Sequence, residues 1–250
     1  MDDATTERLL AQAGIGPGMR VLDVGTGRGD VALIAARLVG AAGEAVGLDV
    51  ADRAVAAARE RARAAGVENV SFVVGDLQAV GDAHGRFDAT VGRRVLMYQD
   101  DPVDAVRRLA QVVTPGGIVF FEEIDSAVQG VSATELPLHD RAQRWLWQTL
   151  EREGAQQHMG LDLYGVLAAA GLESPEVRCE AVVDTPGTAS SAAGAVRGTM
   201  PRILAHGVAT EDEIDIDRLE ARLLDERRAA GATYVRQLVF GAWARRSADA

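Results

Sequence analysis

Three glycines and one acid stand together where an apolar segment of the chain ends. The segment carries Asp23, and the turn after it has glycine at every second position: Gly25, Gly27 and Gly29. Glycine permits positive φ angles and has no Cβ, so the backbone of such a turn can lie close to a ligand. A helix that begins there adds free N–H groups and the positive end of its dipole. The pattern therefore predicts a small-molecule site.

The glycine spacing bears on which ligand binds. A dinucleotide prefers G-x-G-x-x-G at such a turn, whereas this chain has G-x-G-x-G, which is one residue tighter. An acid at the strand end, Asp23, disfavours a pyrophosphate and favours a cationic ligand. A tight turn without a ligand stays open as an alternative, although three glycines are costly without a use.

Two further acids lie at the ends of the next predicted strands. Asp49 comes 24 positions after Gly25, close to the roughly 20 expected for an acid that accepts hydrogen bonds from ribose hydroxyls. Asp76, in VVGDLQ, can accept a hydrogen bond from an exocyclic purine amine or simply stabilise a turn. Together with the glycine turn, these acids predict one binding site along the sheet rim.

The elements that position these residues alternate between β-rich and helical segments. This alternation predicts a parallel sheet covered on both faces, whose ligands bind at the carboxyl ends of the strands. Asp52 is expected to cap a helix that ends at Gly66. The predicted strands span residues 19–25, 44–50, 70–76, 87–93, 116–123, 177–184 and 234–246, with helices at 30–40, 52–66, 100–113, 141–153 and 161–172.

Two segments, residues 126–160 and 185–234, do not follow the alternation. A chain of 250 residues fits one α/β domain with a small appended cap. We therefore expect a single domain over residues 1–250, with these two segments as helical cap insertions that shape the substrate pocket.

Composition narrows the classes of partner. The formal net charge of −11 argues against nucleic acid and anionic membranes as partners. Cys179 is the only cysteine, which excludes an intrachain disulfide, and no cluster with metal-ligand spacing is visible, so no metal site is expected. With no signal peptide and no apolar run of roughly 18 residues, the expected location is the cytoplasm.

Five segments resemble, in order and spacing, the successive motifs of class I S-adenosylmethionine-dependent methyltransferases of the small-molecule, UbiE-like type. The resemblance covers about residues 18–123. It implies a Rossmann-like α/β fold with a seven-stranded, mostly parallel sheet of order 3-2-1-4-5-7-6, whose last strand is antiparallel. The segments are VLDVGTGRGD, VGLDV, VVGDLQ, FDATVGRRVLMY and TPGGIVFFEE.

The same resemblance implies S-adenosyl-L-methionine as the cofactor and a role for ten residues in holding it. Asp23 and the glycine turn would contact the methionine portion, Asp49 would hold the ribose hydroxyls, and Asp76 with Leu77 would flank the adenine. The implied cofactor-binding residues are Asp23, Gly25, Thr26, Gly27, Gly29, Asp49, Val50, Asp76, Leu77 and Arg93.

Methyl transfer needs alignment, exclusion of water and, for a weak nucleophile, a base. Our candidates for catalysis are His158, Glu123 and Tyr98, which follow or end predicted elements near the strand tips or the insertions. His84 and His139 are expected to be exposed.

We therefore expect an enzyme that methylates oxygen or nitrogen, or alternatively carbon, of a neutral or cationic small molecule, with secondary metabolism implied by the resemblance. About a dozen residues precede the lead-in to the first strand, which predicts an incomplete lid or one supplied by a partner subunit, hence a possible homodimer. Two alternatives are a non-catalytic S-adenosylmethionine-binding protein and an NAD-type Rossmann oxidoreductase, which the glycine spacing disfavours.

Overall fold

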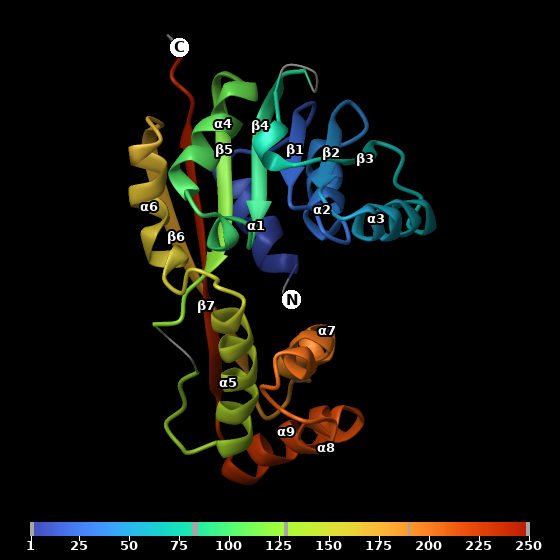
Figure 1. Cartoon of the computed structure of the whole chain (residues 1–250), viewed down its shortest axis with the longest axis vertical. Helices are drawn as coiled ribbons and strands as arrows, with labels where there is room; N and C mark the ends of the chain where they lie inside the picture. Colours follow the sequence, from blue (N-terminus) through green and yellow to red (C-terminus); the bar gives the residue numbers. More distant parts are fainter. Residues whose placement is uncertain (1–2, 82–84, 128–129, 190, 249–250) are drawn as a thin grey trace. The chain divides into compact units, whose positions relative to one another are not determined.

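The computed structural model describes residues 3–81, 85–127, 130–189 and 191–248, and its strands form a seven-stranded sheet of order β3-β2-β1-β4-β5-β7-β6 (Figure 1). This confirms the predicted Rossmann-like α/β fold. The strands are β1 (Arg20–Val24), β2 (Glu44–Asp49), β3 (Val70–Val74), β4 (Phe87–Arg93), β5 (Val113–Ile124), β6 (Glu173–Asp184) and β7 (Tyr234–Arg245).

Strands β1 to β5 are parallel neighbours, and β7 runs against them. The chain moves from β1 to β3 in one direction along the sheet and from β4 to β5 in the other. Right-handed crossovers therefore place helices α2 (Asp30–Val39) and α3 (Asp52–Ala64) on one face and α4 (Pro102–Val112) on the other. The N–H of Gly116, early in β5, donates to the carbonyl of Arg246 at 3.0 Å, just after β7. This pairing of a strand start with a strand end makes β7 antiparallel to β5.

The residues separate into two compact units, which we describe one at a time. The core unit holds residues 3–123, 159–178 and 240–248 of the described chain, and the insert unit holds residues 124–158 and 179–239. The insert unit contains nearly all of both segments expected as insertions, together with residues from the ends of β5, β6 and β7.

The core unit begins with a helix that sequence reasoning missed, α1 (Asp3–Ala13), which packs on α2. Its buried residues include Leu9, Leu10 and Ala13, which lie on one helical face. The residues before β1 therefore contain an 11-residue helix that packs within the core unit. The unit also contains α6 (Met159–Ala169), which packs on α4, and the short 3₁₀ helices η1 (Leu77–Ala79) and η3 (Leu96–Tyr98).

Helix starts in the core unit match the predictions only in part. Asp101 caps α4, because its side chain accepts the N–H of Asp104 at 2.9 Å. Asp52 does not cap α3: Ala51 holds that position, without a side-chain bond, and Asp52 is the first helical residue. An acid there still favours the positive end of the helix dipole.

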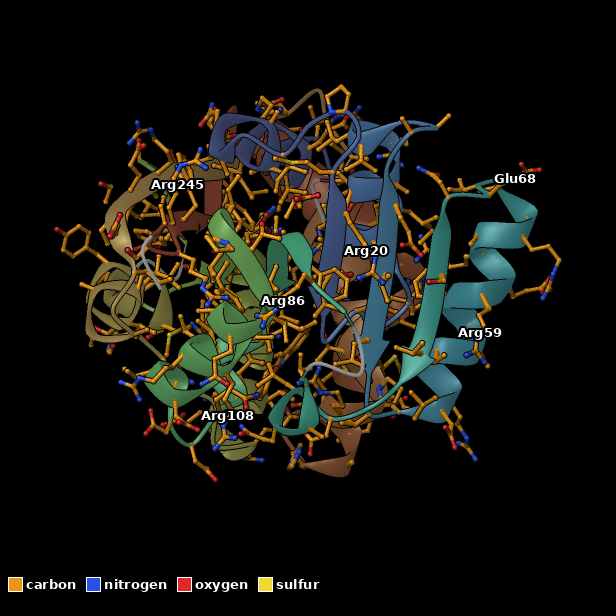
Figure 2. All side chains as sticks on the ribbon, turned by 90° about the horizontal axis from the view of Figure 1, so that it is seen from above. Arg20, Arg59, Glu68, Arg86, Arg108 and Arg245 are labelled. Carbon is orange, nitrogen blue, oxygen red and sulfur yellow. The ribbon has the colours of Figure 1, made fainter. Side chains whose placement is uncertain are left out.

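The rim at the amino ends of the core strands carries arginines (Figure 2). Arg20, at the start of β1, places Nε 2.8 Å from Oε2 of Glu44, and its guanidinium lies 4.3 Å from the ring centre of Phe87. Arg86 lies beside it and offers its carbonyl to Arg20 at 3.0 Å. The acids of the candidate site, Asp23, Asp49 and Glu123, lie at or near the opposite, carboxyl ends of their strands.

The described residues of the insert unit contain the helices α5 (Pro137–Arg152), α7 (Ser191–Ala205), α8 (Glu211–Ile214) and α9 (Ile216–Ala230). Its core packs Trp145 of α5 against Val196, Ile203, Leu219 and Leu223. Within the described ranges, no helix of either unit is both long and apolar enough to cross a membrane.

His139, in α5, is fully buried, which corrects the expectation that it is exposed. Its Nδ1 lies 2.7 Å from Oε2 of Glu226, and its Nε2 lies 2.8 Å from Nη1 of Arg227. Both partners come from α9, so the burial depends on pairing that no local pattern shows. His84, the other histidine expected to be exposed, lies outside the described residues.

Candidate active site

The glycine turn after β1 adopts the backbone angles that glycine favours. The φ angles of Gly25, Gly27 and Gly29 are 61°, 54° and 81°. A Cβ at Gly25 would lie 2.6 Å from Cγ2 of Val95, and one at Gly29 would lie 2.9 Å from the ring of Phe72. These two glycines are therefore required by packing within the protein itself.

Gly27 differs from its two neighbours. The nearest atom to a Cβ at Gly27 would be the carbonyl oxygen of Gly25, at 4.0 Å, so the space beside this residue is open. The N–H of Gly27 donates to Oδ2 of Asp49 at 2.8 Å, and the N–H of Ala51 donates to Oδ1 at 2.9 Å. Because each oxygen retains a second lone pair, the half-buried carboxylate is oriented by the backbone and can still accept hydrogen bonds from a ligand.

Asp23 is buried beneath this turn, with 1% of its surface exposed. Its Oδ2 accepts the hydroxyl of Thr26 at 2.5 Å, whereas its Oδ1 has no hydrogen-bond partner among the described residues. Burial raises the pKa of Asp23 to about 7, and the Thr26 hydroxyl offsets part of that rise. A cation above this carboxyl would stabilise its ionised form.

Apolar and polar groups alternate along the ends of β2 and β3. Val50, directly after Asp49, is 66% exposed, and Val74 at the end of β3 is 48% exposed. The carboxylate of Asp76 accepts the N–H of Gln78 at 2.9 Å and so begins η1, while Leu77 is buried. Asp76 thus stabilises a turn, and its remaining acceptor capacity is available to a neighbouring amine.

Arg93, the last residue of β4, joins three segments of the core unit. Its Nη1 donates to Oγ1 of Thr6 at 2.9 Å and lies 3.3 Å from Oδ1 of Asp3, both in α1. Its Nη2 lies 3.6 Å from Oδ2 of Asp30, the first residue of α2. Arg93 therefore holds α1 at the strand tips, a role that only the missed helix makes visible.

Two glutamates end β5 with buried carboxyls. Oε1 of Glu123 accepts the N–H groups of Val95 and Leu96, at 2.9 and 2.7 Å, and so holds η3, whose last residue is the 43% exposed Tyr98. Burial raises the pKa of Glu123 to about 8, although the two N–H groups oppose the rise. Burial likewise raises the pKa of Glu122, which is 7% exposed. The structure thus links Glu123 and Tyr98 through one turn.

His158 belongs to the insert unit, where it pairs with an acid that sequence reasoning did not single out. Its Nδ1 lies 3.2 Å from Oδ1 of Asp125, whose side chain is 2% exposed, while the His158 side chain is 60% exposed. Asp125 directly follows β5. An acid next to a predicted strand end was the available signal, but its partner lies 33 positions away in the sequence.

The described residues contain no group of three or more His, Cys, Asp or Glu side chains that could hold a metal ion. The groups around Gly27 fit S-adenosylmethionine instead. The open space at Gly27 matches an amino-acid tail, and the oriented carboxylate of Asp49 matches a ribose. The exposed Val50 matches an adenine, and the unpaired Oδ1 of Asp23 matches a positive charge.

Sequence relatives of the chain are methyltransferases. Over 104 residues it is 36% identical to the aklanonic acid methyltransferase of Streptomyces sp. strain C5, a match that covers 42% of this chain and 47% of the relative. It is 29% identical over 178 residues to the ubiquinone/menaquinone biosynthesis C-methyltransferase UbiE of Edwardsiella ictaluri, covering 65% and 69% of the two chains. The chain spans less than half the length of the first curated relatives it matches.

Solved structures support the fold. The YcgJ protein of Bacillus subtilis matches with a TM-score of 0.63 at 18% identity, covering 98% of this chain and 99% of that one. A phosphoethanolamine N-methyltransferase of Haemonchus contortus, solved with S-adenosylhomocysteine, matches with a TM-score of 0.61 at 16% identity, covering 98% of this chain and 52% of the other.

A family model described as a methyltransferase domain matches residues 15–171, which is more than half of the chain. That range includes the glycine turn, the acids after β2 and β3, Arg93 and both glutamates of β5. The chain therefore belongs to the class I S-adenosylmethionine-dependent methyltransferase family.

Proposed function

We propose that this protein transfers the methyl group of S-adenosylmethionine to an oxygen or nitrogen atom of a small organic molecule, with carbon as the alternative acceptor. The observation that carries the proposal is the open space beside Gly27, next to the carboxylate of Asp49, which two backbone N–H groups orient. Packing within the protein accounts for Gly25 and Gly29, whereas at Gly27 the positive φ of 54° favours glycine and the space beside the residue is left open.

The core unit supplies the groups that hold the cofactor. We assign the ribose hydroxyls to Asp49, the adenine to Val50, Leu77 and Asp76, and the methionine tail to the turn that contains Thr26. Arg93 would meet the methionine carboxylate, because its side chain lies at the tip of β4 and its ion pairs with Asp3 and Asp30, at 3.3 and 3.6 Å, are longer than a charge-assisted hydrogen bond.

When bound, the cofactor supplies a methyl group on a positively charged sulfur. The work left to the chain is to align the acceptor, to exclude water and to take up a proton. Among the three candidates, His158 offers an exposed ring nitrogen, Tyr98 an exposed phenol, and Glu123 a buried carboxyl whose raised pKa favours the protonated form at neutral pH. We favour His158 as the base and assign Glu123 and Tyr98 to the turn that faces the acceptor.

The substrate we propose is a neutral or cationic small molecule. The net charge of −11 favours such a molecule over a polyanion. The matched relatives, named for aklanonic acid and for ubiquinone or menaquinone biosynthesis, support an organic acceptor and a role in secondary metabolism. Cytoplasmic location and a homodimer stay predictions.

Titration calorimetry of Gly27→Val against Gly40→Val tests the assignment. Gly40 also has a positive φ, 65°, and no crowding around its Cβ position, so its variant places a strained valine outside the glycine turn. We expect S-adenosylhomocysteine to bind the wild type and Gly40→Val but not Gly27→Val, and NADH to bind none of them. Binding that survives in Gly27→Val would place the ligand elsewhere.

Transfer of a labelled methyl group into a metabolite extract tests catalysis separately from binding. We expect label in an extracted small molecule with the wild type and none with Gly27→Val. Tight binding of S-adenosylhomocysteine without any transfer would favour the alternative of a non-catalytic binding protein.

A further inference from the structure

His158 is the described histidine whose ring is most exposed and yet held by a buried acid. Its Nδ1 lies 3.2 Å from Oδ1 of Asp125, and the exposed fractions of the two side chains are 60% and 2%. Its Nε2 has no hydrogen-bond partner among the residues that the structure describes. The ring is therefore anchored on one side and accessible on the other.

Asp125 is itself fixed by its own segment. Oδ1 also accepts the N–H of Ala127 at 2.8 Å, which closes a tight turn directly after β5. The N–H of Ser126 donates to the carbonyl of Gln157 at 2.9 Å, so the backbone next to Asp125 is bonded to the residue before His158. All of these residues belong to the insert unit. The geometry of the pair thus depends on two backbone hydrogen bonds as well as on the side chains.

The acid decides which ring nitrogen carries the proton. Oδ1 of Asp125 acts as an acceptor toward the N–H of Ala127, so the ring nitrogen that faces the same oxygen must be a donor. The neutral ring then has its proton on Nδ1 and its lone pair on Nε2, the nitrogen that is accessible. A buried carboxylate also offsets the positive charge that appears when Nε2 takes up a proton.

We infer that Asp125 is the positioning residue for His158, holding the ring with a basic Nε2 directed outward to accept the proton of the methyl acceptor. This inference rests on the proposed function. The O–H or N–H bond of the acceptor breaks, its proton goes to Nε2, and its electron pair forms the bond to the methyl carbon. The pair of the broken carbon–sulfur bond stays on sulfur.

His139 provides an internal reference for the protonation state. Its Nδ1 faces Glu226 and its Nε2 faces the guanidinium of Arg227, which can only donate, so this buried ring is held in the same Nδ1–H form. Unlike His158, it offers no free nitrogen. A spectrum of the ring nitrogens should therefore show both rings in one tautomer, of which only the His158 ring depends on Asp125.

Nitrogen-15 NMR of the whole chain with labelled histidine tests the inference without a substrate. The spectrum is recorded about two pH units above the ordinary histidine pKa near 6.5, and His158→Gln identifies the His158 signals. We expect a protonated Nδ1 on His158 in the wild type and a shift toward the Nε2–H form in Asp125→Asn. Asp162→Asn, an exposed acid in α6, serves as the control and leaves the signals unchanged. A wild-type His158 in the Nε2–H form, or an unchanged spectrum in Asp125→Asn, overturns the inference.

Label transfer into the metabolite extract adds a kinetic test. We expect Asp125→Asn to slow transfer roughly 10- to 100-fold and His158→Ala roughly 100-fold or more, with S-adenosylhomocysteine affinity unchanged in both. Full-rate transfer by Asp125→Asn contradicts the inference. Absence of cofactor binding in the wild type would instead contradict the proposed function, while the NMR result would still decide the state of the ring.

Discussion

The two units differ in how their buried charged side chains are paired. In the insert unit, Arg227 of α9 contacts the ring of His139 and lies 3.7 Å from Asp184, and its Nε donates to the carbonyl of Thr185 at 3.1 Å. Glu226 accepts two backbone N–H groups of α5 in addition to its bond with His139. These charged side chains satisfy one another, and they tie α5 and α9 together.

In the core unit, the buried acids at the strand ends are each left with one oxygen that has no partner among the described residues: Oδ1 of Asp23, Oε2 of Glu122 and Oε2 of Glu123. The insert unit has an unpartnered oxygen too, Oε1 of Gln143, but that group is an uncharged amide. A buried carboxylate without a partner lowers the stability of the fold unless a ligand binds it or it takes up a proton. The contrast indicates that the insert unit uses its charges to hold its fold, whereas the core unit keeps acids available at its ligand-binding edge.

Arg227→Ala is expected to have the largest effect on the free energy of unfolding, and it tests whether the charges of the insert unit stabilise the fold. Removing the guanidinium leaves the buried Asp184 without its cation and Nε2 of His139 without its donor, so we expect the free energy of unfolding to fall by about 3–5 kcal/mol. Arg228→Ala, which removes an exposed side chain next to it, should change it by no more than roughly 0.5 kcal/mol. Urea unfolding measures both changes. Equal losses of unfolding free energy in the two variants would mean that the buried network does not stabilise the fold more than an exposed side chain does.

The pH dependence of the free energy of unfolding reports on the buried acids of the core unit. The pKa of Asp23 is raised to about 7 and that of Glu123 to about 8, so between about pH 5 and these values the folded chain holds protons that the unfolded chain has released. Their contribution is therefore complete at low pH and is lost as pH rises through the folded pKa, by up to about 1.4 kcal/mol per pH unit for each group.

Urea unfolding from about pH 5 to 9 checks this slope. We expect Glu123→Gln to flatten the fall in stability relative to the wild type, and Glu176→Gln, an exposed control, to leave it unchanged. A wild-type stability that rises over this range in step with Glu123→Gln would show that the carboxyl is ionised when folded.

Asp49→Ala should affect the ligand more than the fold. We expect S-adenosylhomocysteine to bind about 1–3 kcal/mol more weakly, because charge-assisted hydrogen bonds are lost and the turn at Gly27 is no longer oriented. Asp52→Ala, three residues further on, is the matched control and should bind normally. Near wild-type affinity of Asp49→Ala in calorimetry would count against the site.

The smallest effect is expected at Thr26. Thr26→Val removes the hydroxyl that donates to Asp23, so we expect a loss of about 1 kcal/mol in unfolding free energy and a further rise in the pKa of Asp23. A carbon-13 NMR titration of the Asp23 carboxyl measures the shift. An unchanged titration would mean that burial alone sets the pKa.

Local patterns explain why the core unit was largely predictable. The glycine turn lies between a strand and a helix within ten residues, and Asp49 contacts Gly27 across two adjacent strands. Helix α4 carries its own capping residues. The strand order followed from motif order by family resemblance, which covers the segments where period and spacing are strongest.

Long-range pairing explains what was missed. The burial of His139 depends on α9, whose paired residues lie 87 and 88 positions away, and Asp125 meets His158 across 33 positions. Nothing in the segment around His139 predicts those partners. Helix α1 was missed because so few residues precede β1, although Leu9, Leu10 and Ala13 do share a helical face.

The order of the sheet also constrains how the chain is made. Strand β6 has β7 as its neighbour, and β7 lies between β5 and β6 although it is the last strand in the sequence. During synthesis at roughly 5–20 residues per second, β5 therefore keeps an open edge and β6 has no strand to join until β7 has left the ribosome. The sheet can close only after β7 has been translated, and a truncation within β7 should leave the edge of β5 exposed to aggregation.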